Sequence, residues 1–268
     1  MLTRLIAVFL LAGLLPACST ATIGNEPLRL RVLSYNIKHA RGEDNTFNYQ
    51  RLAEVIKGAQ PDLVALQEVD RETNRSGGVD QAARIGELTG MHYYFAESMP
   101  YQGGGYGNAV LTKAKPGFTT TIALPTETGQ EPRSAGSVRV TEAAESGLPI
   151  YMMSTHLDHR SEQTRVKQTK HLLGLPPMSL YPIVLAGDFN FTPGSEPYNL
   201  LIDAGWADTA QVFGDPKPTH PSDKPRKRID YVFVRPAECW RIVDVRVLDE
   251  PIASDHAPVL VELEYIRP

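Results

Sequence analysis

Four short polar clusters, each at the carboxyl end of an apolar run, are the feature that most constrains this chain. In chain order they are Ser34-Tyr35-Asn36, Gln67-Glu68, Gly187-Asp188-Phe189-Asn190 and Ser254-Asp255-His256. The apolar runs are rich in leucine and β-branched residues, a composition typical of buried strands. We therefore expect each cluster at the tip of a strand, where polar groups from distant parts of the sequence can meet.

Acidic side chains beside buried strands are unfavourable unless a cation compensates for their charge. Hard divalent ions such as Mg²⁺ take oxygen ligands from one or two carboxylates and from substrate phosphates. Glu68, Asp255 and the amide oxygen of Asn36 are the candidate ligands. The sequence thus predicts a Mg²⁺ site, which Mn²⁺ could also fill, and a phosphoester as the substrate.

Asp188 and Asn190 are two residues apart, and such residues project to the same side of an extended segment. We expect the Asp188 carboxylate to act as general base on a water molecule that the Asn190 amide orients. That water would attack phosphorus without a covalent enzyme intermediate.

Two histidines are candidates for stabilising charge on the phosphate. Asp230 is expected to hydrogen-bond His256, raise its pKa and fix its tautomer. His156, at the end of another strand, is expected to donate to a second phosphate oxygen. Each such residue alone is more often a cap, turn or packing residue, and their joint occurrence in this order favours function.

A basic run lies just before Asp230, and Arg228 within it is close enough in sequence to point toward phosphate. The alternative interpretation is a solvated loop face. The formal net charge of −4 is not that of a protein that tracks nucleic acid nonspecifically. We therefore expect no stable nucleic-acid partner. We also expect the protein to be a monomer.

The first residues are typical of an export signal. Residues 1–17 carry one basic residue and a short apolar core, and Leu15-Pro16-Ala17-Cys18 resembles a bacterial lipoprotein cleavage site. We expect lipid on Cys18, a tether over residues 18–27 and attachment to a bacterial membrane. Ser19 favours the outer membrane, on its periplasmic or surface side. The alternative is an ordinary secretory signal.

The remaining residues, 28–268, are predicted to form a single α/β domain. Its two sheets pack face to face, with helices outside. Lipid on Cys18 would leave Cys239 without a disulfide partner, since the chain has two cysteines. Helices are predicted over residues 48–60, 81–88, 161–173 and 196–204. Strands are predicted over residues 28–33, 62–68, 92–95, 118–124, 137–141, 150–154, 182–186, 229–234, 240–247 and 258–264.

Taken as a set, the clusters resemble the endonuclease/exonuclease/phosphatase family. The matching segments are Tyr35-Asn36, Leu66-Gln67-Glu68-Val69, Gly107-Asn108, Thr155-His156-Leu157, Gly187-Asp188-Phe189-Asn190, Ile229-Asp230-Tyr231 and Ser254-Asp255-His256-Ala257-Pro258. The resemblance implies a four-layer α/β sandwich of two mixed sheets and magnesium-dependent phosphoester cleavage. It assigns Asn36, Glu68 and Asp255 to the metal, Asn108 to the substrate, and Asp188, Asn190, His156, Asp230 and His256 to catalysis.

Three hypotheses for the function follow. The first is a membrane-tethered phosphodiesterase or phosphatase acting on a lipid head group or another periplasmic or surface phosphoester. The second is a nuclease acting on DNA or RNA, although the chain cannot form the disulfide of secreted deoxyribonucleases. The third is a lipoprotein that binds ligands on the same scaffold without catalysis. Because every expected catalytic position is occupied, the sequence favours an enzyme.

Overall fold

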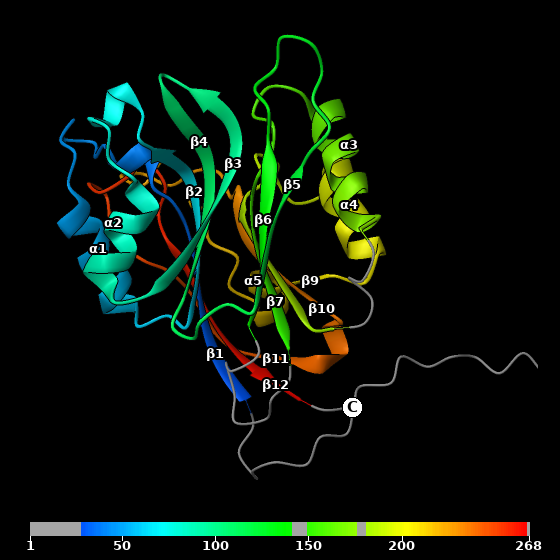
Figure 1. The fold of residues 1–268 in the computed structure, drawn as a ribbon. Coiled ribbons are helices and arrows are strands. Elements are labelled where there is room, and N and C mark those ends of the chain that lie inside the picture. The colour runs from blue at the N-terminus through cyan, green and yellow to red at the C-terminus, as the bar shows by residue number, and fades with distance from the viewer. Residues whose placement is uncertain (1–27, 141–148, 176–180, 267–268) are drawn as a thin grey trace, which may run out of the picture.

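A computed structural model describes residues 28–140, 149–175 and 181–266. Within those ranges the chain forms two six-stranded sheets that pack face to face, with helices on both outer sides (Figure 1). The predicted four-layer α/β sandwich of two mixed sheets is confirmed. The predicted signal peptide and tether, including Cys18, lie outside the described residues.

The first sheet has the strand order β11-β12-β1-β2-β4-β3. Strands β1 and β2 are parallel, while the other neighbouring pairs are antiparallel. The bounds are β1 (Leu28–Asn36), β2 (Leu63–Arg71), β3 (His92–Tyr101), β4 (Gly104–Thr112), β11 (Trp240–Val247) and β12 (Val259–Tyr265).

The second sheet has the order β5-β6-β7-β8-β10-β9, in which β7 and β8 are the parallel pair. Its strands are β5 (Phe118–Ala123), β6 (Ser134–Val140), β7 (Ile150–His156), β8 (Ile183–Asp188), β9 (Ala207–Asp208) and β10 (Asp230–Arg235). Each sheet therefore contains one central parallel pair.

The helices α1 (Tyr49–Ala59) and α2 (Gln81–Thr89) cover the first sheet, and α3 (Glu162–Leu173) and α4 (Glu196–Asp203) cover the second (Figure 1). Asn48 and Ser161 cap α1 and α3 by accepting a backbone N–H three residues on. Shorter elements are α5 (Thr209–Phe213), η1 (Lys38–Ala40), η2 (Asn74–Ser76) and η3 (Ala237–Cys239). Among the described helices, none has both the length and the apolar character needed to cross a bilayer.

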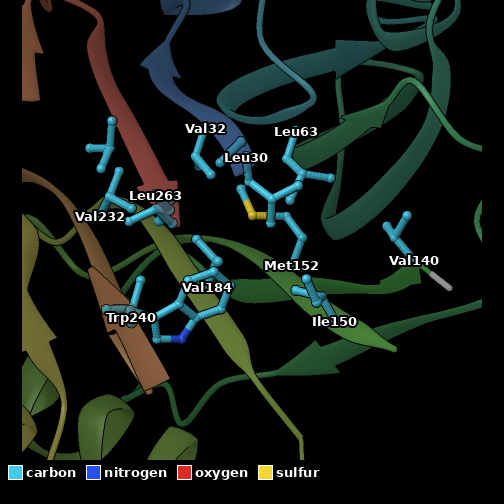
Figure 2. Close-up of a cluster of buried hydrophobic side chains, with 14 of the residues drawn as sticks. Leu30, Val32, Leu63, Val140, Ile150, Met152, Val184, Val232, Trp240 and Leu263 are labelled. Carbon is cyan, nitrogen blue, oxygen red and sulfur yellow. The ribbon is translucent and has the colours of Figure 1, made fainter. Parts of the chain in front are cut away.

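The central strands are buried on both faces. In β1, Leu30 and Val32 face the other sheet, whereas Leu33 and Tyr35 face the helices. Figure 2 shows the inter-sheet core, where Met152 and Val184 of the second sheet lie near Leu30 and Leu63 of the first. Double-sided burial explains why these strands read as continuous apolar runs instead of alternating patterns.

The strand ends bring the polar clusters to one end of the sandwich. His156, the last residue of β7, pairs in register with Asp188, the last residue of β8. Asp230, the first residue of β10, is opposite Asp188 on the other side. Asn36 ends β1 in the facing sheet. Residues far apart in sequence therefore meet where the two sheets end together.

Candidate active site

A cavity of about 690 Å³ opens at this end of the sandwich, and both sheets contribute to its wall. The sequence-predicted residues that line it are Glu68, His156, Asp188, Asn190, Asp255 and His256. Asn36 and Asp230 are buried and hydrogen-bond to lining residues. Eight separately predicted side chains thus belong to one connected site.

A β-bulge directs Glu68 into the cavity. The pairing of β2 with β4 shifts register between Leu66 and Val69, and Glu68 has a φ of 57°. A residue other than glycine in this left-handed conformation carries roughly 1–3 kcal/mol of strain. The bulge interrupts the alternation of side-chain directions along β2, so the Glu68 carboxylate points into the cavity.

One amide group joins the carboxylates of Glu68 and Asp188. Nδ2 of Asn36 donates to Oε1 of Glu68 at 3.1 Å and to Oδ2 of Asp188 at 3.2 Å. Burial alone would raise the pKa of Glu68, but the nearby His39 ring and the Asn36 amide are among the groups that hold it below its usual range. Two acids from different sheets are therefore held close together.

Asp188 lies at the centre of the site and is buried. Its Oδ1 accepts the backbone N–H of Asn190 at 2.9 Å, and its Oδ2 lies 3.4 Å from Nε2 of His156 and 3.7 Å from Nε2 of His256. Burial raises the pKa of Asp188 to about 7; the charge of His256 opposes the shift and that of Asp230 adds to it. The carboxylate is thus set to exchange a proton near neutral pH.

The predicted hydrogen bond between His256 and Asp230 is present, with Nδ1 of the ring 2.9 Å from Oδ2 of the carboxylate. Thr219 donates to the same carboxylate. Burial alone would lower the pKa of His256, but the charges of Asp230 and Asp188 outweigh it and raise the pKa to about 10. His256 is therefore a cation at neutral pH.

His156 has a different partner. Its Nδ1 lies 3.1 Å from Nη1 of Arg133, and Nη2 of the same guanidinium lies 3.2 Å from Nδ1 of His159. Burial and the charge of Arg133 lower the pKa of His156 well below its usual value. The two histidines beside Asp188 therefore differ in charge.

The local geometry corrects one expectation. Asn190 has a φ of 52°, so the segment is not extended there, and the same-side argument from strand spacing is wrong. The turn directs Nδ2 of Asn190 to the carbonyl of Leu157 at 3.1 Å. Asp255 and His256 also lie in a bend rather than in an extended segment. Asn190, Asp255 and His256 nevertheless all line the cavity.

The expectation that Arg228 points toward phosphate is wrong. Its buried guanidinium forms an ion pair with Asp208, its carbon Cζ lies 4.6 Å from the centre of the Tyr231 ring, and it is absent from the cavity wall. A buried guanidinium needs a carboxylate partner, and Asp208 provides it. Lys227, the preceding residue, is exposed and does line the cavity.

Asn108 is buried behind the site, where its Nδ2 donates to the carbonyl of Ser134 at 2.9 Å. Its Oδ1 has no partner within the described protein. Asn108 is not among the residues of the cavity wall, so its role in substrate binding stays a prediction.

Several residues of the site carried little signal in the sequence. Arg133 precedes its strand instead of following one, so the strand-end pattern does not find it. His39 and His159 are close in sequence to Asn36 and His156, and that closeness is the one signal that could find them. His220 follows no buried strand, so the strand-end pattern does not find it, yet its ring centre lies 4.6 Å from that of His256 in the cavity wall.

The donor set fits a divalent cation. The carboxylates of Glu68 and Asp188 both lie beside Asn36, one from each sheet, and both are oxygen donors. Ligand atoms of Asp188, Asp230 and His256 also lie within 4.8 Å of one another. Asp255, the second acid predicted to bind the metal, has Oδ2 3.3 Å from Nζ of Lys38. Oxygen donors of this kind suit Mg²⁺ or Mn²⁺.

Known proteins resemble this chain in sequence and in fold. The chain is 24% identical over 246 residues to the uncharacterised protein YbhP of Escherichia coli, covering 87% of this chain and 95% of YbhP. It resembles an endonuclease/exonuclease/phosphatase from Beutenbergia cavernae, with a TM-score of 0.70 and 26% identity over 88% of this chain and 72% of the other.

The mannosyl-6-phosphatase Bt3783 of Bacteroides thetaiotaomicron has the same fold, with a TM-score of 0.72 and 20% identity over 87% of this chain and 99% of the other. The sequence profile of the endonuclease/exonuclease/phosphatase family matches residues 33–256, from within β1 to His256. The chain therefore belongs to the endonuclease/exonuclease/phosphatase family.

Proposed function

We propose that this protein is a Mg²⁺-dependent phosphoester hydrolase that uses Asp188 to activate the attacking water. Members of its family are in general hydrolases that depend on a divalent metal ion. The observation that carries the proposal is the pair of carboxylates, Glu68 and Asp188, joined by Asn36 beside two histidines of different charge. A phosphatase among the proteins of the same fold supports the reaction class.

The residues divide the work as follows. Asp188 accepts the proton of the attacking water at Oδ2, while its Oδ1 is held by the backbone of Asn190. His256, kept charged by Asp230, places a positive charge beside the phosphoryl oxygens. His156 offers a second hydrogen bond from Nε2. The fixed geometry lowers the barrier because these donors need no reorganisation during the reaction.

Glu68 and Asp255 would hold the ion, whose role when bound is to draw charge from a phosphoryl oxygen. Asn36 would join them only with its amide turned, because its Oδ1 here accepts the backbone N–H of Lys38 at 3.0 Å while Nδ2 faces Glu68. His256 is a weaker candidate metal ligand than Glu68 and Asp255, because a metal binds the neutral imidazole. The charges of Asp230 and Asp188 instead favour the protonated ring. Asp188 accepts a hydrogen bond from Asn36 on one side and lies near Asp230 and His256 on the other. A carboxylate oxygen of Asp188 can therefore also bind the ion.

Hydrolysis of bis-p-nitrophenyl phosphate and p-nitrophenyl phosphate, with Mg²⁺ and with EDTA, tests the proposal. We expect activity only with the ion, and a loss of about 10²–10⁴-fold in kcat for Asp188→Asn, the range that a general base supplies. Asp203→Asn, an exposed acid at the end of α4, is the matched control. Equal rates for Asp188→Asn and wild type would remove Asp188 from the mechanism.

Plasmid DNA distinguishes the alternative nuclease. Efficient Mg²⁺-dependent nicking, with weak hydrolysis of the small esters, would favour a nuclease. Intact plasmid beside hydrolysed small esters would favour a phosphodiesterase or phosphatase. If neither substrate class is cleaved, the ligand-binding lipoprotein becomes the preferred hypothesis.

We also propose that the protein is exported and lipid-anchored through Cys18 to a bacterial membrane, with the outer membrane favoured. The support is the sequence of residues 1–19 alone. Nothing in the catalytic proposal depends on this anchor.

A further inference from the structure

Arg133 is a buried arginine in the wall of the cavity, just before β6. Only 4% of its surface is exposed. Its Nη1 lies 3.1 Å from Nδ1 of His156 and 3.0 Å from a carboxylate oxygen of Glu131, and its Nη2 lies 3.2 Å from Nδ1 of His159. One guanidinium therefore connects two histidines on the β7 side of the site.

The chemistry of guanidinium fixes the direction of these hydrogen bonds. It has five N–H donors, no acceptor, and it does not lose its proton in proteins. Nδ1 of His156 must then accept, which requires an unprotonated Nδ1 and places the ring proton on Nε2. A doubly protonated ring would set an N–H donor against another donor and bury two positive charges 3.1 Å apart.

The second ring nitrogen of His156 faces the reacting groups. Nε2 lies 3.4 Å from Oδ2 of Asp188, on the side where His256 also approaches the same oxygen. His256 has a carboxylate behind it, which keeps it charged, whereas His156 has an arginine behind it. Both rings therefore direct an Nε2–H group toward Oδ2 of Asp188, the His256 ring as a cation and the His156 ring as a neutral imidazole.

We propose that Arg133 is a positioning residue that holds His156 as the neutral tautomer with its proton on Nε2. This inference deepens the proposed function, on which its role in turnover rests. His156 then donates a hydrogen bond to the substrate without carrying a proton to the leaving group, since loss of the Nε2 proton from a neutral ring is not accessible near pH 7. Burial and Arg133 lowering the pKa of His156 agree with the geometry.

The tautomer is measurable without any activity. Long-range ¹H–¹⁵N spectra of the metal-free wild-type protein, with His156 assigned by comparison with His156→Gln, should show a protonated Nε2 and an unprotonated Nδ1 at pH 7. A proton on Nδ1, or a doubly protonated ring, would overturn the proposal. Because the spectrum needs no substrate, this failure is separable from failure of the proposed function.

Variants test whether Arg133 acts through His156. Arg133→Met keeps the apolar stem and removes the donors; we expect kcat to fall by roughly 10–100-fold, as for other groups that orient a site residue, with KM nearly unchanged. Arg133→Lys retains a donor and should recover part of the loss. Arg139→Met, six positions along in β6 and outside the cavity wall, should behave as wild type.

The double variant decides between positioning and direct contact. If Arg133 acts through His156, Arg133→Met should cost almost nothing further in kcat when His156 is already replaced by Gln. Losses that multiply in the double variant, or a raised KM with unchanged kcat in Arg133→Met, would show that Arg133 contacts the substrate itself and would overturn the proposal. If Arg133→Met fails to fold, the wild-type spectrum still tests the tautomer. Arg133→Lys, alone and combined with His156→Gln, then replaces Arg133→Met in the kinetic comparison.

Discussion

The His256 imidazole links the stability of the protein to pH, because its folded-state pKa of about 10 lies above the ordinary value of 6.5. Burial opposes this shift, and Asp230 and Asp188 produce it. A raised pKa means that the folded state binds the proton more tightly than the unfolded chain does. The stabilisation is therefore complete below pH 6.5 and is lost as the pH rises through about 10.

We expect the free energy of unfolding of the metal-free protein to decrease between pH 6.5 and 10, and to decrease less in Asp230→Asn, where the main source of the shift is gone. Urea unfolding in EDTA at several pH values measures the slope. Asp244→Asn, whose carboxylate pairs with Arg246 at the surface, should keep the wild-type slope. Parallel slopes for Asp230→Asn and wild type would contradict the assignment.

Glu68 is the residue through which metal dependence is best tested. Glu68→Gln keeps an oxygen for the Asn36 amide but removes the negative charge. We expect the Mg²⁺ concentration needed for half-maximal activity to rise at least about 10-fold, the lower range for a perturbed metal site. Glu72→Gln, an exposed acid just after β2, is the control. An unchanged Mg²⁺ titration in Glu68→Gln would count against this ligand.

At the residue scale, the sequence identifies site residues that directly follow buried strands. It does not identify site residues that lie elsewhere along the chain. Asp188 and His256 were found because an acid or imidazole after an apolar run has few structural explanations. Arg228 was misassigned because closeness in sequence to Asp230 does not say which carboxylate a buried arginine meets, and that carboxylate, Asp208, comes from another strand. Arg133 was missed because it precedes β6, whereas the sequence pattern looks only for polar residues that follow a strand.

At the scale of elements, the apolar runs located the central strands well because both faces of those strands are buried. The predicted helix over residues 48–60 is α1 (Tyr49–Ala59), and the predicted strand over 240–247 is β11. Of the three consecutive glycines at 103–105, only Gly103 lies in a turn, with a φ of 86°. Gly104 and Gly105 begin β4, where Cβ atoms would meet neighbouring atoms at 2.2 and 2.6 Å.

Gly187 shows how a strand position serves the site. A Cβ atom there would lie 1.9 Å from the carbonyl oxygen of Thr155 in β7, so β7 and β8 could not keep their spacing. We expect Gly187→Ala to destabilise the protein by roughly 1–3 kcal/mol, a range typical of overpacking, and to lower kcat because the His156–Asp188 register would change. Urea unfolding and hydrolysis assays measure the two effects.

Gly58 is the matched control, because a Cβ atom at this position in α1 meets nothing within 4 Å. Gly58→Ala should stabilise the protein by about 0.5–1 kcal/mol through its helix propensity, with kcat unchanged. Equal behaviour of the two alanine variants would show that Gly187 is not required for the close approach of the strands.

On the scale of the whole molecule, the site depends on the packing of one sheet against the other. Asn36 and Glu68 come from the first sheet, and Asp188 comes from the second. Just behind the site, Ser154 of β7 donates to the carbonyl of Leu66 at 2.9 Å and accepts from Gln67 at 3.1 Å. These buried polar contacts fix the sheets against each other where the catalytic groups meet, a relation that no sequence pattern reveals.

Membrane attachment is also a property of the whole chain. If Cys18 is lipidated, the protein expressed with residues 1–17 should incorporate labelled palmitate and partition into Triton X-114, and Cys18→Ser should do neither. Cys239→Ser, at a buried position, is the control and should remain lipidated. Labelling that persists in Cys18→Ser, or a wild-type protein released into the aqueous phase, would favour the ordinary secretory signal.

The direction of β1 has a consequence for such an anchor. Leu28 at its start is paired with Tyr265 of β12, while Asn36 at its end belongs to the site. Eight steps of about 3.3 Å separate the two by roughly 26 Å. Ten residues, 18–27, can span at most about 33 Å when fully extended, which exceeds this separation, so lipid on Cys18 would leave the cavity within reach of either the bilayer surface or the surrounding water.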